Sequence, residues 1–384
     1  MNNGLKRMIL FNTSTSVVFT FVDLFVNLYI WQQNKQLLDL VWFNFFMFSL
    51  WSISYVSGSY LFYKKDLKTV MRAGSIFSLI LFGLLSFVTF DEPFHWIMFA
   101  GSIYGLMRGV FSAGITLALS ILGEGKEFKL FFQQSAFWRK AVNNFIPLTF
   151  AFILSTLNYG NTFIVMFIFS IGLFLLSFML PDISPKKDRI SNPFTKEIGL
   201  KKVFKGGKTK LLPYSYYFGG MFAEFQTIFL MYFTFTITED KFFVALLNVF
   251  YTLLVFIMIK LFNASKLSPV SWMIIGILLA FLGLGLATTL SNLWLLVPNI
   301  LLVIGNFIFR TNYYSQQYEQ LEGEGKTKRI QITIWREVIL CISRISFLTI
   351  IIILHAIDLF SIYILLSMII FTTSIVPVIH NKFK

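Results

Sequence analysis

The feature that most constrains the fold is a series of apolar segments, each long enough to cross a lipid bilayer as a helix. One crossing takes about 20 apolar residues, and segments of this length recur along the whole chain. We therefore expect about twelve membrane-spanning helices. They lie near residues 10–31, 39–62, 70–90, 94–121, 134–157, 162–181, 213–236, 242–262, 269–290, 292–312, 332–355 and 358–379.

Composition supports this reading. Hydrophobic residues make up 57% of the chain and charged residues only 13%, whereas soluble domains carry about 25% charged residues. A soluble core of this size could not hide 48 phenylalanines, but lipid is a solvent in which such a surface is stable. We therefore predict an all-α membrane protein.

The basic residues indicate how the chain is oriented. Apart from Arg108, Arg310 and Arg344 inside the spans, only Lys35 and Lys241 fall on one side of the alternating loops. All other Lys and Arg residues fall on the opposite side, together with both termini. Because positive residues stay cytoplasmic, we expect cytoplasmic N- and C-termini. This distribution also accounts for the net charge of +14, so no nucleic-acid partner is needed.

The chain reads as two related halves. Gly-Glu-Gly-Lys at 123–126 recurs at 323–326, and Trp138-Arg139 recurs as Trp335-Arg336, both about 200 residues later. This offset indicates duplication of a six-helix unit, and an even number of spans gives both copies the same orientation in the membrane. We predict six-helix bundles at 1–181 and 213–384, joined by a basic cytoplasmic linker at 182–212.

This architecture resembles the major facilitator superfamily along the whole length. Two local patterns add to the resemblance. The loop between the second and third spans carries a basic cluster, and the fourth span carries an Arg followed by glycines. The residues concerned are Gly58, Lys64, Lys65, Asp66, Lys68 and Arg72 in the loop, and Arg108, Gly109 and Gly114 in the span. The resemblance implies halves that rock about a cavity lined by the first, fourth, seventh and tenth spans.

Ionisable residues inside the spans are the main candidates for a site, because each costs on the order of 2.5–3.5 kcal/mol at mid-membrane on insertion scales. Asp23, Arg108, Glu224 and Arg310 fall on those four spans at matching positions of the two halves. They invite Asp23–Arg108 and Glu224–Arg310 pairing, or a crossed version. Either carboxyl could accept a proton, because burial disfavours its charged form and a nearby Arg favours it.

Polar residues and glycines recur at helical spacing beside each of these charges. The stripes are Thr13, Ser16, Thr20, Asn27 and Trp31 in the first span, Gly101, Gly105, Ser112 and Thr116 in the fourth, Tyr217, Gly220 and Thr227 in the seventh, and Asn299, Asn306, Tyr313 and Gln317 in the tenth. They predict wet faces, with Asn27 and Asn306 joining the four charges in a binding cavity. Hydrogen bonding between helices is the alternative.

The repeated loops suggest a cytoplasmic gate in which charges pair across the halves. Its members are Glu124, Lys126, Arg139, Glu324, Lys326 and Arg336. A plain loop with interfacial Trp and Arg is the alternative. His95, His355 and His380 are not clustered, so we expect no metal site, and no motif indicates a cofactor.

The leading hypothesis is a secondary transporter working by alternating access, with proton-coupled efflux of a small organic or amphipathic molecule. Lipid or glycolipid translocation, or a non-transporting immunity or receptor-like protein with the same fold, are the alternatives. We expect no enzyme, because no nucleophile motif, His-Asp pair or metal cluster lies near the spans. Richness in Phe, Ile, Lys and Asn points to an AT-rich genome and hence to a bacterial plasma membrane. We expect a monomer.

Overall fold

The structure is a computed structural model that describes residues 3–88, 92–122, 126–185, 192–195, 198–205, 209–265, 267–321, 324–355, 373 and 375–381. Within these residues the chain is helical and contains no strand. It divides into two compact units, and each is described by itself. Unit 1 comprises Met1–Val203 with Gly325–Val338, and unit 2 comprises Phe204–Glu324 with Ile339–Lys384.

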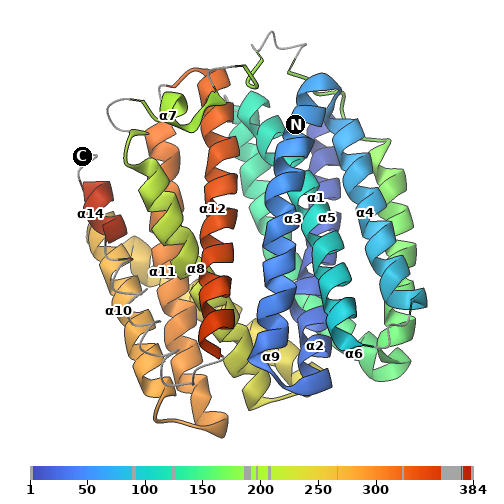
Figure 1. Ribbon diagram of the computed structural model, residues 1–384, viewed down its shortest axis with the longest axis vertical. Coiled ribbons are helices and arrows are strands. Elements are labelled where there is room, and N and C mark those ends of the chain that lie inside the picture. Colours follow the sequence, from blue (N-terminus) through green and yellow to red (C-terminus); the bar gives the residue numbers. More distant parts are fainter. Residues whose placement is uncertain are drawn as a thin grey trace. The chain divides into compact units, whose positions relative to one another are not determined.

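Unit 1 is built from long helices that run side by side (Figure 1). They are α1 (Asn3–Phe21), the π-helical turn η1 (Val22–Val26), α2 (Asn27–Asn34), α3 (Leu37–Lys64), α4 (Leu67–Phe87), α5 (Pro93–Leu122), α6 (Lys126–Ser177) and the short α7 (Leu200–Val203). The segments α1, η1 and α2 are continuous and form one span, Gly4–Asn34.

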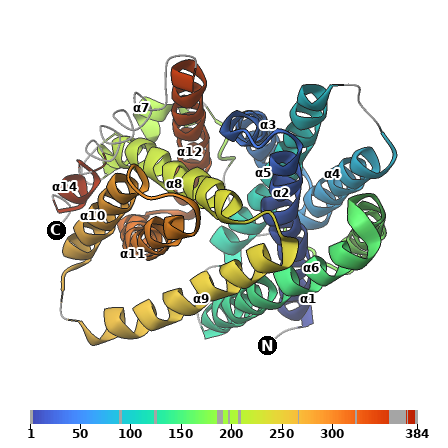
Figure 2. The ribbon, with the colours of Figure 1, turned by 90° about the horizontal axis from the view of Figure 1, so that it is seen from below.

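Unit 2 is built in the same way, and Figure 2 shows its helices from below. They are α8 (Leu212–Ile237), α9 (Lys241–Ala264), α10 (Pro269–Ala287), the 3-10 turn η4 (Asn292–Leu295), α11 (Leu296–Leu321) and α14 (Ile375–Asn381). The helix α12 (Lys326–His355) belongs to unit 1 up to Val338 and to unit 2 from Ile339 onward.

The first part of α12 is tied to the linker, which explains why residues 325–338 group with unit 1. The Gln331 side chain donates to the carbonyl of Pro193 at 2.9 Å, and the Trp335 indole donates to the carbonyl of Ile198. Residues 325–338 fall within the second predicted bundle, because hydropathy follows helix order along the chain and does not show which segment a helix end contacts.

Ten helical stretches in the described residues are long and apolar enough to cross a membrane. The difference from the twelve expected spans has two sources. The spans predicted at 134–157 and 162–181 lie in the single element α6, and most of the span predicted at 358–379 lies outside the described residues.

The helix α6 consists of two arms. Its 52 residues would measure roughly 78 Å at 1.5 Å per residue, whereas the hydrocarbon core is about 30 Å thick. Asn158 interrupts the helix with φ 62° and ψ 178°. Its side chain accepts a hydrogen bond from the backbone N–H of Asn161 at 3.1 Å, as an N-cap does. Asn158 therefore ends the first arm and caps the second.

Side-chain caps fix other helix starts. Asp66 accepts from the backbone N–H of Thr69 at 2.7 Å, and Asp240 accepts from that of Phe243 at 2.7 Å. Ser268 accepts from the N–H of Ser271 at 3.1 Å, directly before Pro269 at the first position of α10. Each cap satisfies an N–H that has no partner within its helix.

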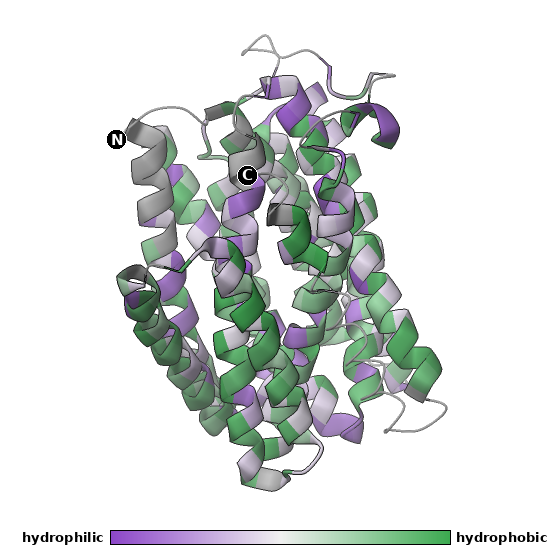
Figure 3. Ribbon diagram, turned by 90° about the vertical axis from the view of Figure 1, so that its left-hand side faces the viewer, coloured by the Kyte–Doolittle hydropathy of each residue, from purple (hydrophilic) through white to green (hydrophobic). Residues whose placement is uncertain are grey.

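Aromatic side chains fill the interior of unit 1 and also cover its periphery. Phe21 is fully buried and packs its ring against those of Phe150, Phe82 and Phe163, with the Phe150 centroid at 4.8 Å. By contrast, Phe145 is 70% exposed. Figure 3 shows apolar residues along the middle of the helices. Large exposed apolar side chains on spanning helices are stable against lipid.

Candidate functional site

Asp23 lies in η1, near the middle of the first span. In this turn the backbone N–H of Asn27 reaches back five residues to the carbonyl of Val22. The Asn27 side-chain amide donates to the carbonyl of Asp23 at 3.1 Å and contacts that of Val22 at 3.4 Å. A π-helical turn leaves a carbonyl without its usual partner, and Asn27 supplies one. Asn27 thus holds open the turn that carries Asp23.

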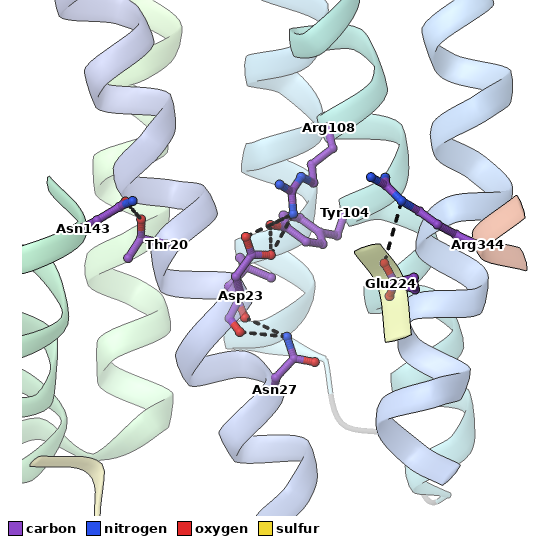
Figure 4. Close-up of polar contacts among 9 residues, drawn as sticks. Thr20, Asp23, Asn27, Tyr104, Arg108, Asn143, Glu224 and Arg344 are labelled. Atoms are coloured by element: carbon purple, nitrogen blue, oxygen red, sulfur yellow. Dashed lines mark hydrogen bonds and ion pairs between the residues drawn. The ribbon is translucent and has the colours of Figure 1, made fainter. Parts of the chain in front are cut away.

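The Asp23 carboxylate is held by two residues of α5 (Figure 4). Arg108 Nη1 lies 2.8 Å from Asp23 Oδ1 and 3.1 Å from Oδ2, and the Tyr104 hydroxyl donates to Oδ1 at 2.6 Å. Arg108 Nη1 also donates to the Tyr104 hydroxyl at 3.0 Å. These contacts form a closed triangle of charge-assisted hydrogen bonds.

Aromatic rings surround the Arg108 guanidinium. Its Cζ lies 4.9 Å from the ring centroids of Phe19 and Trp51, and 5.3 Å from that of Tyr104. The ion pair is partly accessible, since the Asp23 side chain is 45% exposed and that of Arg108 is 22% exposed. Arg108 is thus held both by the Asp23 carboxylate and by ring faces, each of which attracts a cation.

Close packing of α5 on α3 positions Arg108. A Cβ on Gly105 would lie 2.1 Å from the carbonyl oxygen of Met47, and one on Gly109 would lie 1.9 Å from Ser54 Oγ. A Cβ on Gly101 would likewise lie too close to the carbonyl oxygen of Phe43. Gly101 and Gly105 therefore follow the alternative of contact between helices and do not line a wet face. They form the α3 interface, where only a missing side chain allows the backbones to approach.

Glu224 pairs with Arg344 in unit 2. Glu224 Oε2 lies 3.8 Å from Arg344 Nε, and the two side chains are only 4% and 9% exposed. The suggested Glu224–Arg310 pair is not formed, and no ion pair of Arg310 occurs among the described residues. The reason is packing. Gly220, one turn before Glu224, faces Ser343 and Leu340 of α12, so this face of α8 meets α12.

Two members of the α11 stripe are structural. Asn299 donates to the hydroxyls of Thr234 and Tyr251 at 3.1 and 3.0 Å, and the Tyr313 hydroxyl donates to the carbonyl of Ser215 at 3.0 Å. These bonds hold α11 to α8 and α9, as the alternative of interhelical hydrogen bonding predicted. Asn306 Oδ1 and Arg310 Nε are buried and have no hydrogen-bond partner within the described part of the chain.

Polar residues of the other stripes also bond between helices. Thr20 donates to Asn143 Oδ1 at 3.2 Å, and the hydroxyls of Tyr55 and Thr116 lie 2.7 Å apart. Both contacts join different helices of unit 1. Thr20 and Thr116 therefore contribute to packing between helices.

The gate residues are only partly described. Glu124 lies outside the described residues, as does the side chain of Lys126. Arg139 and Lys326 are exposed, and Glu324 is half-buried. Arg336 is buried and donates to its neighbour Glu337 at 2.7 Å. Pairing of the gate charges across the halves stays a prediction.

Sequence reasoning missed several neighbours of the site. Tyr104 precedes Arg108 by one helical turn and thus shares its face, a spacing that could have identified it. Trp51 and Phe19 come from other helices, and no local pattern points to them. Among the described residues, no cluster of three or more His, Cys, Asp or Glu could hold a metal ion.

No family model and no curated protein matches the sequence, but the fold matches solved structures over the whole chain. A POT family transporter in complex with 5-aminolevulinic acid aligns with a TM-score of 0.74 at 11% identity, covering 100% of this chain and 97% of that one. The POT family transporter PepTSo gives 0.72 at 10% identity, covering 100% and 98%. The chain has the major facilitator fold.

A third structure leads to the same fold. The nucleoside transporter NupG aligns with a TM-score of 0.68 at 12% identity, covering 100% of both chains. This likeness, together with the apolar spans, makes the protein a multi-pass α-helical membrane protein with this fold. The structures it resembles are transporters and not enzymes.

Proposed function

We propose that the protein is a secondary active transporter that works by alternating access, with the Asp23–Arg108 pair at its binding site. The observation that carries this proposal is a half-exposed carboxylate paired with an arginine near the middle of two apolar spans. Lipid-facing positions penalise such groups. The fold is one that solved transporters share.

The surroundings of Asp23 favour a cationic, amphipathic substrate. The carboxylate would attract a positive group. The faces of Phe19, Trp51 and Tyr104, which hold the Arg108 guanidinium, would accept a substrate cation and its apolar body in place of Arg108. Arg108 is already engaged by Asp23. A substrate cation would therefore compete with Arg108 for Asp23.

Proton coupling follows from the same competition. Protonated Asp23 loses its attraction for a cation and for Arg108, so proton and substrate would bind in turn. Exchange of an inward proton for an outward substrate would give efflux. Glu224 is almost completely buried against Arg344, which makes Asp23 the more accessible carboxyl. We expect a monomer in a bacterial plasma membrane.

Ligand-dependent thermal stability of the purified protein tests the binding site. A ligand that binds only the folded state stabilises it by about 2.7 kcal/mol at 100 times its Kd, and this raises the melting temperature. We expect hits among small organic cations with an aromatic or alkyl body, and their loss in Asp23→Asn. Asp39→Asn is the matched control, because Asp39 contacts Asn34 at a helix end.

Either of two results would contradict the proposal. One is a set of cationic hits that Asp23→Asn retains in full, because the ligand would then bind elsewhere. The other is a panel in which only lipids stabilise the wild-type protein, because lipid translocation would then be the better reading.

A further inference from the structure

A second polar site lies at one end of unit 1, outside the Asp23–Arg108 cluster. Two arginines from different helices meet the C-terminal end of α6. Arg7 of α1 donates to the carbonyl of Met179 at 3.2 Å, and the Arg72 guanidinium of α4 stacks on the ring of Phe178, with Cζ 4.1 Å from the centroid. Both contacts leave guanidinium N–H groups for a further acceptor.

The second arm of α6 contacts both of these helices, and the two arginines meet neighbouring residues at its end, Met179 and Phe178. Ser78 of α4 hydrogen-bonds Ser170 at 2.7 Å, and Phe21 of α1 packs its ring on Phe163 at 6.2 Å. Both partners belong to the second arm. Figures 1 and 2 show α4 beside this arm.

Exposed apolar side chains continue from the arginines along the same helices. Leu10 lies one turn beyond Arg7 and is 53% exposed, and Ile76 lies one turn beyond Arg72 and is 46% exposed. On α6, Leu175 is 60% exposed and precedes Phe178 by one turn. The arginines therefore lie next to an exposed apolar surface that is suited to acyl chains.

The local charge is positive. Lys6, Lys65 and Lys68 are carried by the same segments as the two arginines. Residues 3–10, 64–76 and 177–185 contain two carboxylates, Asp66 and Asp182, and Asp66 is engaged in capping Thr69. The positive-inside pattern places this end in the cytoplasmic leaflet, where anionic lipids attract basic residues.

We propose that Arg7 and Arg72 form a binding site for the phosphate of an anionic phospholipid in the cytoplasmic leaflet, with its acyl chains along α1, α4 and the second arm of α6. The guanidinium groups hold the phosphate, for which arginine geometry is well matched. The lipid joins three helices of unit 1. The site does not depend on Asp23, so it is independent of the transport proposal.

Native mass spectrometry of the full-length protein with phosphatidylglycerol tests this site. We expect bound phosphatidylglycerol on the wild type and little phosphatidylcholine. Each basic residue near an anionic surface contributes about 1 kcal/mol, so Arg7→Gln should weaken the phosphatidylglycerol affinity about fivefold, and Arg7→Gln/Arg72→Gln more. Arg7 is exposed, so its single variant should fold even where the double variant does not.

Two controls separate a specific site from general attraction. Lys260→Gln removes an exposed basic residue of unit 2 and should leave the affinity unchanged. Glycerol 1-phosphate supplies the phosphate without acyl chains and should not raise the melting temperature as the lipid does. Equal phosphatidylglycerol binding by wild type and Arg7→Gln would overturn the proposal. So would equal weakening in Lys260→Gln, or full stabilisation by glycerol 1-phosphate.

Discussion

A single guanidinium nitrogen of Arg108 reaches both carboxylate oxygens of Asp23, at 2.8 and 3.1 Å, although the two residues lie 85 positions apart. The pair is too exposed to be explained by stability alone. Partly solvated ion pairs contribute about 0–1 kcal/mol, whereas each charge costs on the order of 2.5–3.5 kcal/mol at the middle of a span. A role in binding explains why both charges are present.

The Tyr104 hydroxyl contributes to this pair, and removing it should have a measurable but limited effect. Tyr104→Phe takes a donor from Asp23 and an acceptor from Arg108. Hydrogen bonds to charged groups contribute about 1.5–3 kcal/mol, so we expect a lower melting temperature and ligand affinity reduced by about tenfold or more. Thermal unfolding and ligand titration measure both.

Tyr60→Phe is the matched control, because Tyr60 is exposed and its ring contacts Phe194 and Lys64. It should behave as the wild type. A Tyr104→Phe variant indistinguishable from Tyr60→Phe would show that the hydroxyl does not support the pair.

The Glu224–Arg344 contact predicts a specific energetic coupling. Removing one member of a buried ion pair typically lowers the unfolding free energy by about 3–5 kcal/mol, because the remaining charge stays buried without a partner. Glu224→Gln and Arg344→Gln should each lower the melting temperature. The double variant should lose less unfolding free energy than the two single variants lose together. A double-mutant cycle on thermal stability measures this coupling.

Arg310→Gln provides the comparison for that cycle. It should show no comparable coupling to Glu224→Gln, because the structure pairs Glu224 with Arg344. Strong coupling of Glu224 to Arg310 and none to Arg344 would favour the pairing suggested by the repeat.

The close contact of α5 and α3 makes Gly105 sensitive to a single methyl group. A Cβ there would lie 2.1 Å from the Met47 carbonyl oxygen, so Gly105→Ala must push backbone apart. Overpacking costs about 1–3 kcal/mol, and the melting temperature should fall. Gly172→Ala, whose Cβ would meet nothing within 4 Å, should be neutral. A neutral Gly105→Ala would mean that α3 and α5 are farther apart than described.

Hydropathy was sufficient to predict most spans, because a helix exposed to lipid must be apolar along its whole length. The division of α6 at Asn158 also matches the gap between the spans predicted at 134–157 and 162–181. Hydropathy placed Asp23 and Arg108 on the first and fourth spans. Periodicity gives only the face of a helix and not its neighbour. The sequence therefore could not identify Arg344 as the partner of Glu224, or Gly105 as a packing residue.

The most direct test of the account is ligand flux driven by an imposed pH gradient in proteoliposomes, with a ligand identified by thermal stabilisation. The account predicts that wild type and Asp39→Asn couple ligand movement to the gradient. Asp23→Asn should fold normally, and its gradient-driven rate should be at least about tenfold lower than that of the wild type. A tenfold decrease corresponds to an activation free energy higher by about 1.4 kcal/mol. Undiminished gradient-driven flux in Asp23→Asn would contradict the central claim that Asp23 is the coupling carboxylate.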